Sequence, residues 1–390
     1  MRIIERDVIV VGAGPGGSIC ASYLARAGVD VLLMDKEVFP RDKPCADAQT
    51  GNTMKHVIEL GADTEIKELG ILANYLKVVS ANYEETIAPT SGAYITPRWL
   101  FDDLMKRTAV RHGAECLEDC WVNDVIKEDG YVVGVKAKYQ GEFIEVRSKL
   151  VIGADGSHSV VAKAVGMFPE YSGSIAPALR TYFTGVELDP KLAPKGYIEL
   201  HFDERVKPAY IWVFPSGKDG IKDGFCNVGM GVADRDSYDG WSLEERFYDW
   251  VENSPYGERF KRAKQVAPWK GWRVPDAHQR LRNCGNGFML IGDAGSTVIP
   301  LVDEGISAAA DSGKFAADAA IEALKENNFS DEFLYERYPM KFDEMYNDRI
   351  KTIKLVQESM YDPNVTNTMV HKFNTDLKFK EAAFKKMFKA

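Results

Sequence analysis

Short apolar runs separated by a glycine-rich turn define the first predicted unit of the chain. Residues 6–11 form a strand-length apolar run, residues 18–27 carry apolar positions at helical spacing, and residues 29–34 form a second apolar run. Runs of this length are typical of buried strands, whereas apolar positions three and four apart are typical of helices. The chain therefore begins with a predicted β-turn-α-β unit whose turn reads GAGPGG.

Further alternating and helical patterns divide the rest of the chain. Residues 36–56 are rich in Pro, Lys and Asp and predict a loop, and the helix expected over 98–112 has Asp102 on its polar side. The other predicted segments are strands over 71–96, a strand meander over 115–152, a strand-rich stretch over 178–232, a short helix over 242–253, a strand over 287–292, a long Ala-rich helix over 305–325 and a helical, charged tail from residue 331.

Composition narrows the class of protein. A chain of 390 residues suits two intertwined domains, and a net charge of −9 gives no electrostatic support for binding nucleic acid. The six cysteines show no CxxC pair and no Cys/His cluster, so we expect no metal site and no disulfide framework. The sequence has no apolar run of membrane-spanning length and no small-residue cleavage site near its start, so a cytoplasmic protein is expected.

The glycine turn carries the strongest chemical signal. Gly12, Gly14 and Gly17 form GxGxxG between a strand and a helix, and Asp35 ends the next strand. Glycines allow a tight turn, close approach to a pyrophosphate and close helix–strand packing, while the acid accepts hydrogen bonds from ribose hydroxyls. We predict that FAD binds here, with contacts from Gly12, Ala13, Gly14, Pro15, Gly17, Asp35 and Lys36.

Two later segments carry weaker signals of the same kind. Asp155 and Gly156 follow a predicted strand, although, taken alone, that segment is better explained as a plain strand-to-helix turn capped by Ser157 or Ser159. Gly292-Asp293 ends another predicted strand, so Asp293 can reach a ribityl hydroxyl of the flavin. Gly305 opens a helix whose positive end can lie near the flavin ring.

The three motifs in this order resemble the p-hydroxybenzoate-hydroxylase-type FAD fold, and other residues resemble one branch of it. AYIWVFP at 209–215 and NVGMG at 227–231 are similar to the Tyr-x-Trp-x-Phe-Pro core of the geranylgeranyl reductase family. KPCADA at 43–48 resembles its Pro-Cys-Gly-(Glu/Asp)-Gly loop, and RWLFD at 98–102 resembles its Arg-x-x-Phe-Asp element. The resemblance runs from about residue 7 to residue 320.

The resemblance implies an α/β fold, with a Rossmann-type FAD-binding domain of three β/β/α layers, an inserted, mostly antiparallel substrate sheet and a helical C-terminal tail. FAD-binding segments are expected at 1–70, 96–170 and 276–328. Substrate-domain segments are expected at 71–95 and 171–275, and the helical C-terminal region at 329–390.

The resemblance also implies functional residues. The positions that correspond to the family's FAD contacts are Pro15, Asp35, Cys45, Ala46, Ala48, Arg98, Val122, Asp293, Gly305 and Ile306. Tyr210, Trp212 and Phe214 would line a prenyl-binding cavity, although aromatic residues on a strand are more often simple core residues. The predicted catalytic set is Cys45, Asp303, Tyr210 and Trp212.

Several positions depart from the family pattern. Ala46 and Ala48 replace two glycines of the cysteine loop, and Asp303 stands where a glycine normally faces the flavin. Asp303 either faces the ring, where its charge would oppose that of the reduced flavin, or caps the following helix. Cys45 is either a proton donor or a small packing contact.

The leading functional hypothesis is FAD-dependent reduction of C=C bonds in a prenyl chain of a lipid or quinone. The alternatives are an aromatic monooxygenase or halogenase, an electron-transfer flavoprotein acting on quinone, and a non-catalytic FAD-binding protein. No second GxGxxG is present, so either NAD(P)H docks transiently or a ferredoxin-like protein supplies electrons. Lysines and aromatic residues interleave over 378–390, which leaves open a peripheral contact with the inner face of a membrane or a helix docked on the protein.

Overall fold

A mixed sheet forms the centre of the first structural unit. The computed structural model describes residues 2–168, 175–232, 241–277, 280–301 and 304–387. Within them the first sheet has eight strands in the order β16-β17-β9-β1-β2-β6, and the β7–β8 hairpin continues from β9. The strands are β1 Arg2–Val11, β2 Val31–Met34, β6 Glu115–Leu117, β7 Cys120–Glu128, β8 Tyr131–Tyr139, β9 Glu142–Gly153, β16 Cys284–Gly285 and β17 Phe288–Leu290.

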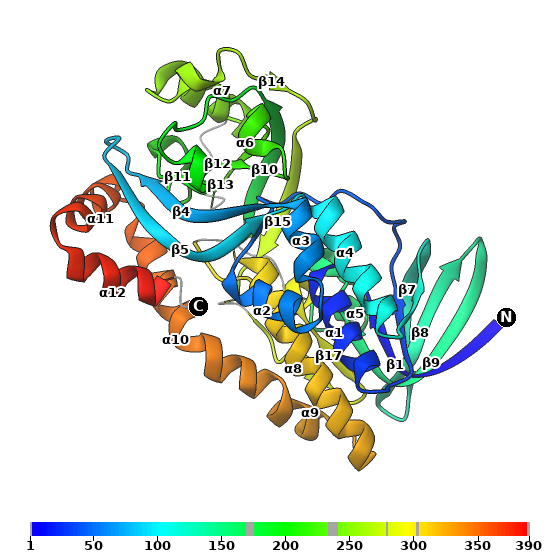
Figure 1. The fold of residues 1–390 in the computed structure, drawn as a ribbon. Coiled ribbons are helices and arrows are strands. Elements are labelled where there is room, and N and C mark those ends of the chain that lie inside the picture. Colours follow the sequence, from blue (N-terminus) through cyan, green and yellow to red (C-terminus); the bar gives the residue numbers. More distant parts are fainter. Residues whose placement is uncertain (1, 169–174, 233–240, 278–279, 302–303, 388–390) are drawn as a thin grey trace.

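The second sheet is mostly antiparallel and lies beside the first unit (Figure 1). Among the described residues it has nine strands in the order β14-β10-β13-β12-β11-β4-β5-β3, with β15 paired to β10, and its one parallel pair joins β4 to β11. The strands are β3 Ala48–Gln49, β4 Ile71–Val79, β5 Glu85–Ile95, β10 Ile175–Thr184, β11 Tyr197–His201, β12 Ile211–Pro215, β13 Cys226–Gly231, β14 Lys264–Gln265 and β15 Lys270–Pro275. This arrangement confirms the predicted fold class.

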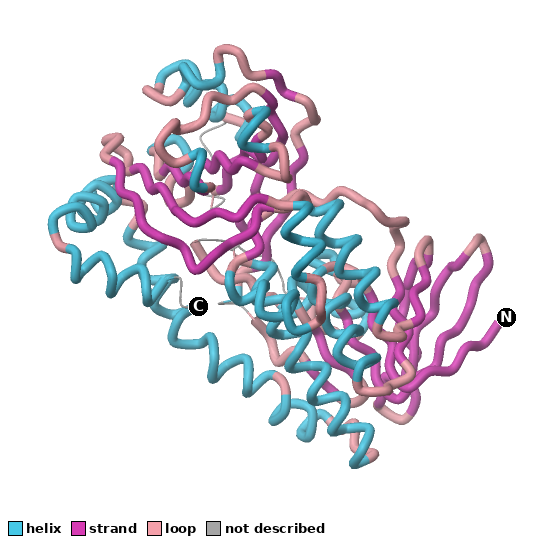
Figure 2. The backbone as a smooth tube through the Cα atoms, viewed as in Figure 1, coloured by secondary structure: helices cyan, strands magenta, loops and turns pink. Residues whose placement is uncertain are grey.

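Helices cover the first sheet and form the C-terminal region (Figure 2). Helices α1 and α8 pack closely, because an added Cβ at Gly313 on α8 would lie 2.5 Å from the Gly16 carbonyl oxygen on α1. The helices are α1 Pro15–Arg26, α2 Gly51–Glu59, α3 Asp63–Leu69, α4 Arg98–Arg111, α5 Val160–Ala164, α6 Gly220–Asp223, α7 Leu243–Asn253, α8 Gly305–Glu326, α9 Asp331–Arg337, α10 Pro339–Ser359, α11 Pro363–Thr375 and α12 Leu377–Met387.

Two details of the predicted pattern were wrong. The segment 36–56 is loop only as far as residue 47, since β3 and α2 follow it. Asp102 was expected on the polar side of its helix, yet its side chain is fully buried and pairs with two arginines. A carboxylate that finds fixed cationic partners can be buried, which the spacing of polar residues along one helix does not reveal.

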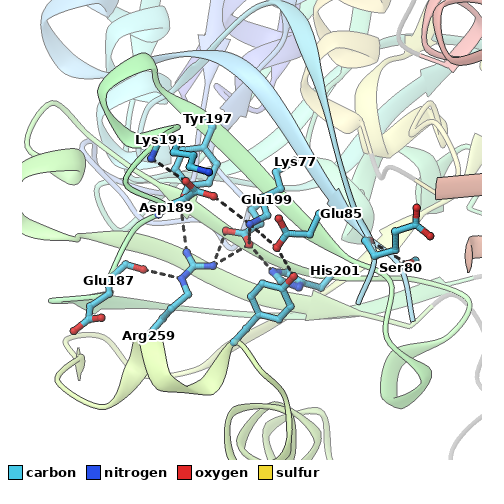
Figure 3. Close-up of polar contacts among 12 residues, drawn as sticks. Lys77, Ser80, Glu85, Glu187, Asp189, Lys191, Tyr197, Glu199, His201 and Arg259 are labelled. Carbon is cyan, nitrogen blue, oxygen red and sulfur yellow. Dashed lines mark hydrogen bonds and ion pairs between the residues drawn. The ribbon is translucent and has the colours of Figure 1, made fainter. Parts of the chain in front are cut away.

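The second sheet has two different faces. The outer face, which carries Ile211 and Val213, packs against the aromatic side chains of α7 and its neighbourhood, including Phe247 and Trp250. It also carries a buried ion network centred on Glu199 (Figure 3). We call the opposite side, which carries Tyr210, Trp212 and Phe214, the inner face of this sheet; it packs against Ala46, Ala48, α11 and α12.

The C-terminal helices lie along the molecule beside the β4–β5 hairpin (Figure 1). Val370 of α11 and Phe384 of α12 pack into the same apolar cluster as the aromatic residues of β12. Among the described helices, none combines the length and apolar character that crossing a bilayer requires. The tail is therefore docked on the protein over residues 363–384, and the membrane contact expected from its lysines stays a prediction.

Candidate functional site

The glycine turn has the local geometry that a dinucleotide pyrophosphate needs. Gly12 has φ +102°, and a Cβ there would lie 2.3 Å from the Ala154 carbonyl oxygen. A Cβ at Gly17 would lie 1.8 Å from the Gly12 carbonyl oxygen, so only glycine allows this contact. Gly14 precedes α1 without any side-chain cap, which leaves backbone N–H groups of the first turn available to an anion.

Asp35 lies at the end of β2, beside that turn. Its carboxylate accepts hydrogen bonds from the backbone N–H of Ala13 at 2.7 Å and of Glu37 at 2.9 Å. Burial raises the pKa of Asp35, and these two hydrogen bonds and the charge of Arg41 oppose that rise. Because a carboxylate has several acceptor positions, Asp35 can bind the turn and still receive ribose hydroxyls. Lys36, by contrast, is exposed and lies over the Trp121 ring.

The loop over 36–47 carries functional candidates that the sequence motifs did not single out. The nearest atom to a Cβ built on Gly14 is Nη2 of Arg41, at 3.8 Å, so a cation lies where the pyrophosphate would pass. Lys43 lies 3.4 Å from Asp293 and over the Trp272 ring. Burial lowers the pKa of Lys43, and Asp293 opposes this. The basic character of the loop that follows the second strand is the sequence signal that could have identified Arg41 and Lys43.

Arg98 and Asp102 form a buried ion pair at the start of α4. The guanidinium donates to both carboxylate oxygens, at 2.6 and 2.7 Å, and Arg41 donates to the same carboxylate at 2.8 Å. Burial alone would lower the pKa of Arg98, but Asp102 and then the Cys45 thiol outweigh it and raise that pKa. The buried pair therefore fixes Arg41, and through Arg41 it holds the 36–47 loop against α4.

Asp47 ties the same loop to the second sheet, although the sequence prediction did not include it. Its carboxylate accepts hydrogen bonds from the Tyr182 hydroxyl at 2.7 Å, from the Ser216 hydroxyl at 3.0 Å and from the backbone N–H of Arg98 at 3.2 Å. The residue is fully buried with φ +67°, and its burial raises the pKa of its carboxyl. Asp47 thus joins both structural units at one point.

Cys45 is partly buried and lies in the loop that Asp47 and the Arg98–Asp102 pair hold in place. Its sulfur accepts the Asp47 N–H at 3.4 Å, and its carbonyl oxygen accepts the Asn227 side-chain amide at 2.7 Å. The oxygen of the same Asn227 amide accepts the Trp212 indole N–H at 2.8 Å. One amide therefore holds the predicted catalytic loop and the predicted prenyl wall in fixed positions. Both roles weighed for Cys45, proton donor and packing contact, are compatible with this position.

The third predicted motif, which contains Asp293 and Gly305, lies close to the 36–47 loop, because Asp293 pairs with Lys43. Asp293 lies in a 3₁₀ turn after β17, and its carboxylate oxygen would be 3.8 Å from a Cβ on Gly305, the first residue of α8. Ile306 is buried in the core beside α1. The Glu304 carboxylate is held by Thr50 at 2.7 Å and by Arg349 at 2.5 Å, so it does not cap α8. Asp303, predicted to be catalytic, lies outside the described residues.

Asp155 and Val122 occupy positions with an evident structural role. The carboxylate of Asp155 accepts the N–H groups of Val160 and Val161 and the Ser159 hydroxyl, so it holds the start of α5, and Ser159 caps that helix as the alternative interpretation expected. Val122 is a core residue of the first sheet, so only its backbone could contact a cofactor. Gly156 faces open space. Their contacts with FAD stay predictions.

Two comparisons with known proteins decide the family. Residues 5–215 match the family model described as FAD binding domain. A digeranylgeranylglycerophospholipid reductase of Methanopyrus kandleri is 30% identical over 363 residues, which cover 92% of this chain and 91% of that protein. The chain belongs to the digeranylgeranylglycerophospholipid reductase family. It is an FAD-dependent oxidoreductase, and the glycine turn, Asp35 and the uncapped α1 fit that cofactor.

Solved structures share the fold of this reductase. A geranylgeranyl bacteriochlorophyll reductase-like protein of Thermoplasma acidophilum matches with a TM-score of 0.86 at 24% identity, covering 99% of this chain and 97% of that one. A myxobacterial chondrochloren halogenase matches with a TM-score of 0.77 at 21% identity, covering 98% and 89%. At these identities the likeness extends to the fold alone, which the halogenase also has.

Asp35→Ala is expected to weaken FAD binding by about 1–3 kcal/mol, because one charge-assisted hydrogen bond to the ribose is lost. Titration of apoprotein with FAD, followed by quenching of flavin fluorescence, measures the change. Glu37→Ala is the matched control, since it removes an exposed carboxylate two residues away. Full FAD affinity in Asp35→Ala, or a preference for FMN, would contradict the assignment.

Proposed function

We propose that this reductase saturates C=C bonds in the geranylgeranyl chains of a glycerophospholipid. The observation that carries the proposal is the aromatic inner face of β12, which packs against the loop holding Cys45. Tyr210, Trp212 and Phe214 are 7%, 5% and 4% exposed, and Ala46 and Ala48 belong to the same apolar cluster. An apolar wall against the cofactor loop suits a hydrocarbon substrate. The name of the Methanopyrus kandleri relative supports the same substrate class.

The residues of this chain would position the substrate and exclude water. Reduced FAD, when bound, supplies a hydride to one carbon of the double bond. Tyr210, Trp212 and Phe214 would hold the prenyl chain in a dry environment, and Asn227 fixes the Trp212 ring relative to Cys45. The second carbon then needs a proton, and the Cys45 thiol is our candidate to donate it from the loop.

FAD-loaded enzyme, reduced with dithionite in the absence of oxygen, is expected to add two hydrogens per double bond to digeranylgeranylglycerophospholipid. Mass spectrometry of the extracted lipid measures the gain, and the return of the oxidised flavin spectrum measures the rate. Trp212→Phe, which keeps an aromatic ring but loses the hydrogen bond to Asn227, should slow turnover without preventing it. A product formed only with oxygen, and containing inserted oxygen, would instead identify a hydroxylase.

The electron donor is a separate part of the proposal. Within the described residues the first sheet presents one glycine-rich β-turn-α-β unit, which the FAD assignment uses. We therefore propose that NAD(P)H docks transiently or that a ferredoxin-like protein delivers electrons. Anaerobic flavin reduction by NADH, NADPH and reduced ferredoxin in parallel distinguishes these donors. Failure of all three would contradict this part and leave the dithionite assay unaffected.

A further inference from the structure

A cavity with mostly apolar walls and two basic residues lies at the opposite edge of the inner face from the C-terminal helices. Its volume is about 260 Å³, and β10 and β15 supply its basic residues. Arg180 and Lys270 provide positive charge, Asp42 of the 36–47 loop lies between them, and Trp99, Tyr182 and Phe225 form aromatic walls. The function proposed above gives no role to Arg180 or Lys270 and does not account for this cavity.

Both cations of the cavity are paired, but one donor of Arg180 has no acceptor among the described residues. Asp42 accepts a hydrogen bond from Arg180 at 2.6 Å and one from Lys270 at 2.7 Å, so two cations share one carboxylate. Arg180 is 1% exposed, and its Nε–H has no hydrogen-bond acceptor among the described residues. A buried guanidinium with an unused donor is costly unless a further acceptor is bound at some stage of function. The arrangement therefore favours an anionic ligand.

Arg180 lies on the same face of the second sheet as the aromatic wall of the proposed prenyl site. Arg180 of β10 is opposite Gly229 of β13, and Gly229 is opposite Trp212 of β12, so these residues share one face of the sheet. The Trp212 ring extends over Gly229, since a Cβ there would lie 2.3 Å from Cζ2 of that ring. With adjacent strands spaced regularly, the Arg180 and Trp212 backbones are about 10 Å apart.

We propose that the cavity between Arg180 and Lys270 binds the phosphate group at the polar end of the prenyl lipid while its chain lies on Trp212. A guanidinium and an ammonium are suitable donors to phosphate oxygens, and the aromatic walls accommodate the adjoining glycerol carbons. Lys270 is the more exposed cation, so it is the group that an entering headgroup meets at the rim. The identity of the lipid rests on the proposed function, whereas the binding of an anion is argued from the cavity alone.

The test uses FAD-loaded, dithionite-reduced enzyme with two substrates, digeranylgeranylglycerol with and without its phosphate. The measured quantity is the ratio of kcat/KM for the two lipids. In Lys270→Gln the preference for the phosphorylated lipid should fall by roughly tenfold, as expected for loss of one charge-assisted hydrogen bond. Arg180→Gln should reduce it further. Lys264→Gln, which removes an exposed lysine of β14, is the matched control and should keep the wild-type ratio.

A binding measurement separates the cavity from the activity. Calorimetric titration of oxidised holoenzyme with glycerol 1-phosphate should give binding that Lys270→Gln weakens by roughly tenfold. Binding of glycerol 1-phosphate would support the anion site even if the enzyme reduced neither lipid. Failure to reduce either lipid would contradict the proposed function and leave the anion site unaffected. Should Arg180→Gln fail to fold, Lys270→Gln decides, because its side chain lies at the rim.

Three results would overturn the proposal. The first is an unchanged lipid ratio in Lys270→Gln together with unchanged glycerol 1-phosphate binding. The second is binding of inorganic phosphate with no preference for the phosphorylated lipid, which would assign the cavity to a free anion. The third is a raised KM for NADH or NADPH in Lys270→Gln with the lipid ratio intact, which would assign the cavity to the electron donor.

Discussion

Gly17→Ala is expected to abolish FAD binding and to destabilise the fold. The new Cβ would lie 1.8 Å from the Gly12 carbonyl oxygen and 3.1 Å from the Ala154 side chain, both parts of the packed turn. Since the nearest atom is backbone, α1 must shift away from β1 and carry the phosphate-binding N–H groups with it. We expect a loss of about 3 kcal/mol in unfolding free energy, the upper end of the typical cost of overpacking. Urea unfolding of the apoprotein and FAD titration measure the two effects.

Gly14→Ala is the matched control for this prediction. Its Cβ would meet nothing closer than the Arg41 guanidinium at 3.8 Å, and the backbone there has φ −68° and ψ −176°, which alanine adopts readily. The apoprotein should therefore fold normally, while FAD binds more weakly because the methyl group occupies the approach of the pyrophosphate. Equal unfolding free energies for the two variants would contradict the packing argument. Normal FAD binding in Gly14→Ala would contradict the location of the pyrophosphate.

Glu199→Gln is expected to destabilise the protein by about 3–5 kcal/mol, because it leaves buried cations without their central carboxylate. Glu199 is fully buried on the outer face of the second sheet (Figure 3). Its oxygens accept two hydrogen bonds from Arg259, at 2.8 and 2.9 Å, and lie 3.8 Å from Lys77 and 3.0 Å from His201. Urea unfolding at neutral pH measures the loss. An exposed pair provides the control, since Glu258→Gln at the Lys261 ion pair should cost below about 1 kcal/mol.

The same network predicts a pH dependence. Burial alone would raise the pKa of Glu199, but contacts with His201, Arg259 and Lys77 outweigh it and lower the pKa to about 2 from its ordinary 4.5. A carboxyl with a lowered folded-state pKa contributes stability that is complete above pH 4.5 and is lost as the pH falls towards 2. The difference in unfolding free energy between wild type and Glu199→Gln should therefore shrink over that interval. A constant difference would show that Glu199 is not ionised in the native state.

The glycine turn could be predicted from the sequence because its function depends on local geometry. Gly12, Gly17 and Asp35 are close in sequence, and the strand and helix around them follow from apolar spacing. Each missing Cβ corresponds to a specific close approach in the structure, which is why the motif is informative without any tertiary information.

The anchors of the 36–47 loop could not be predicted in the same way. Asp47 depends on Tyr182 and Ser216, which are 135 and 169 residues away, and Asp102 depends on Arg41, 61 residues away. A charged residue in a polar segment is indistinguishable by pattern from a solvated one. Tertiary contacts determine the burial of each: Asp47 is buried where Tyr182 and Ser216 meet the loop, and Asp102 where Arg41 of the loop meets α4.

The aromatic strand illustrates an intermediate case. Alternation predicted a strand at Tyr210, Trp212 and Phe214, but it could not tell a core residue from a cavity wall. In the structure these side chains are buried against Ala46 and Ala48 and under α11. Both alanines, noted as departures from glycine, thus add methyl groups at the boundary between the loop and the wall.

The order of strands in the first sheet also constrains how the protein can be made. β1 pairs with β9, which the ribosome synthesises more than a hundred residues later, and β9 in turn pairs with β17 near residue 290. Helix α8, which packs on α1, follows later still. A nascent chain therefore exposes its glycine turn on an incomplete sheet until nearly the whole domain has emerged. We therefore expect the complete cofactor site, which includes Asp293 and the start of α8, to form only after those segments have been synthesised.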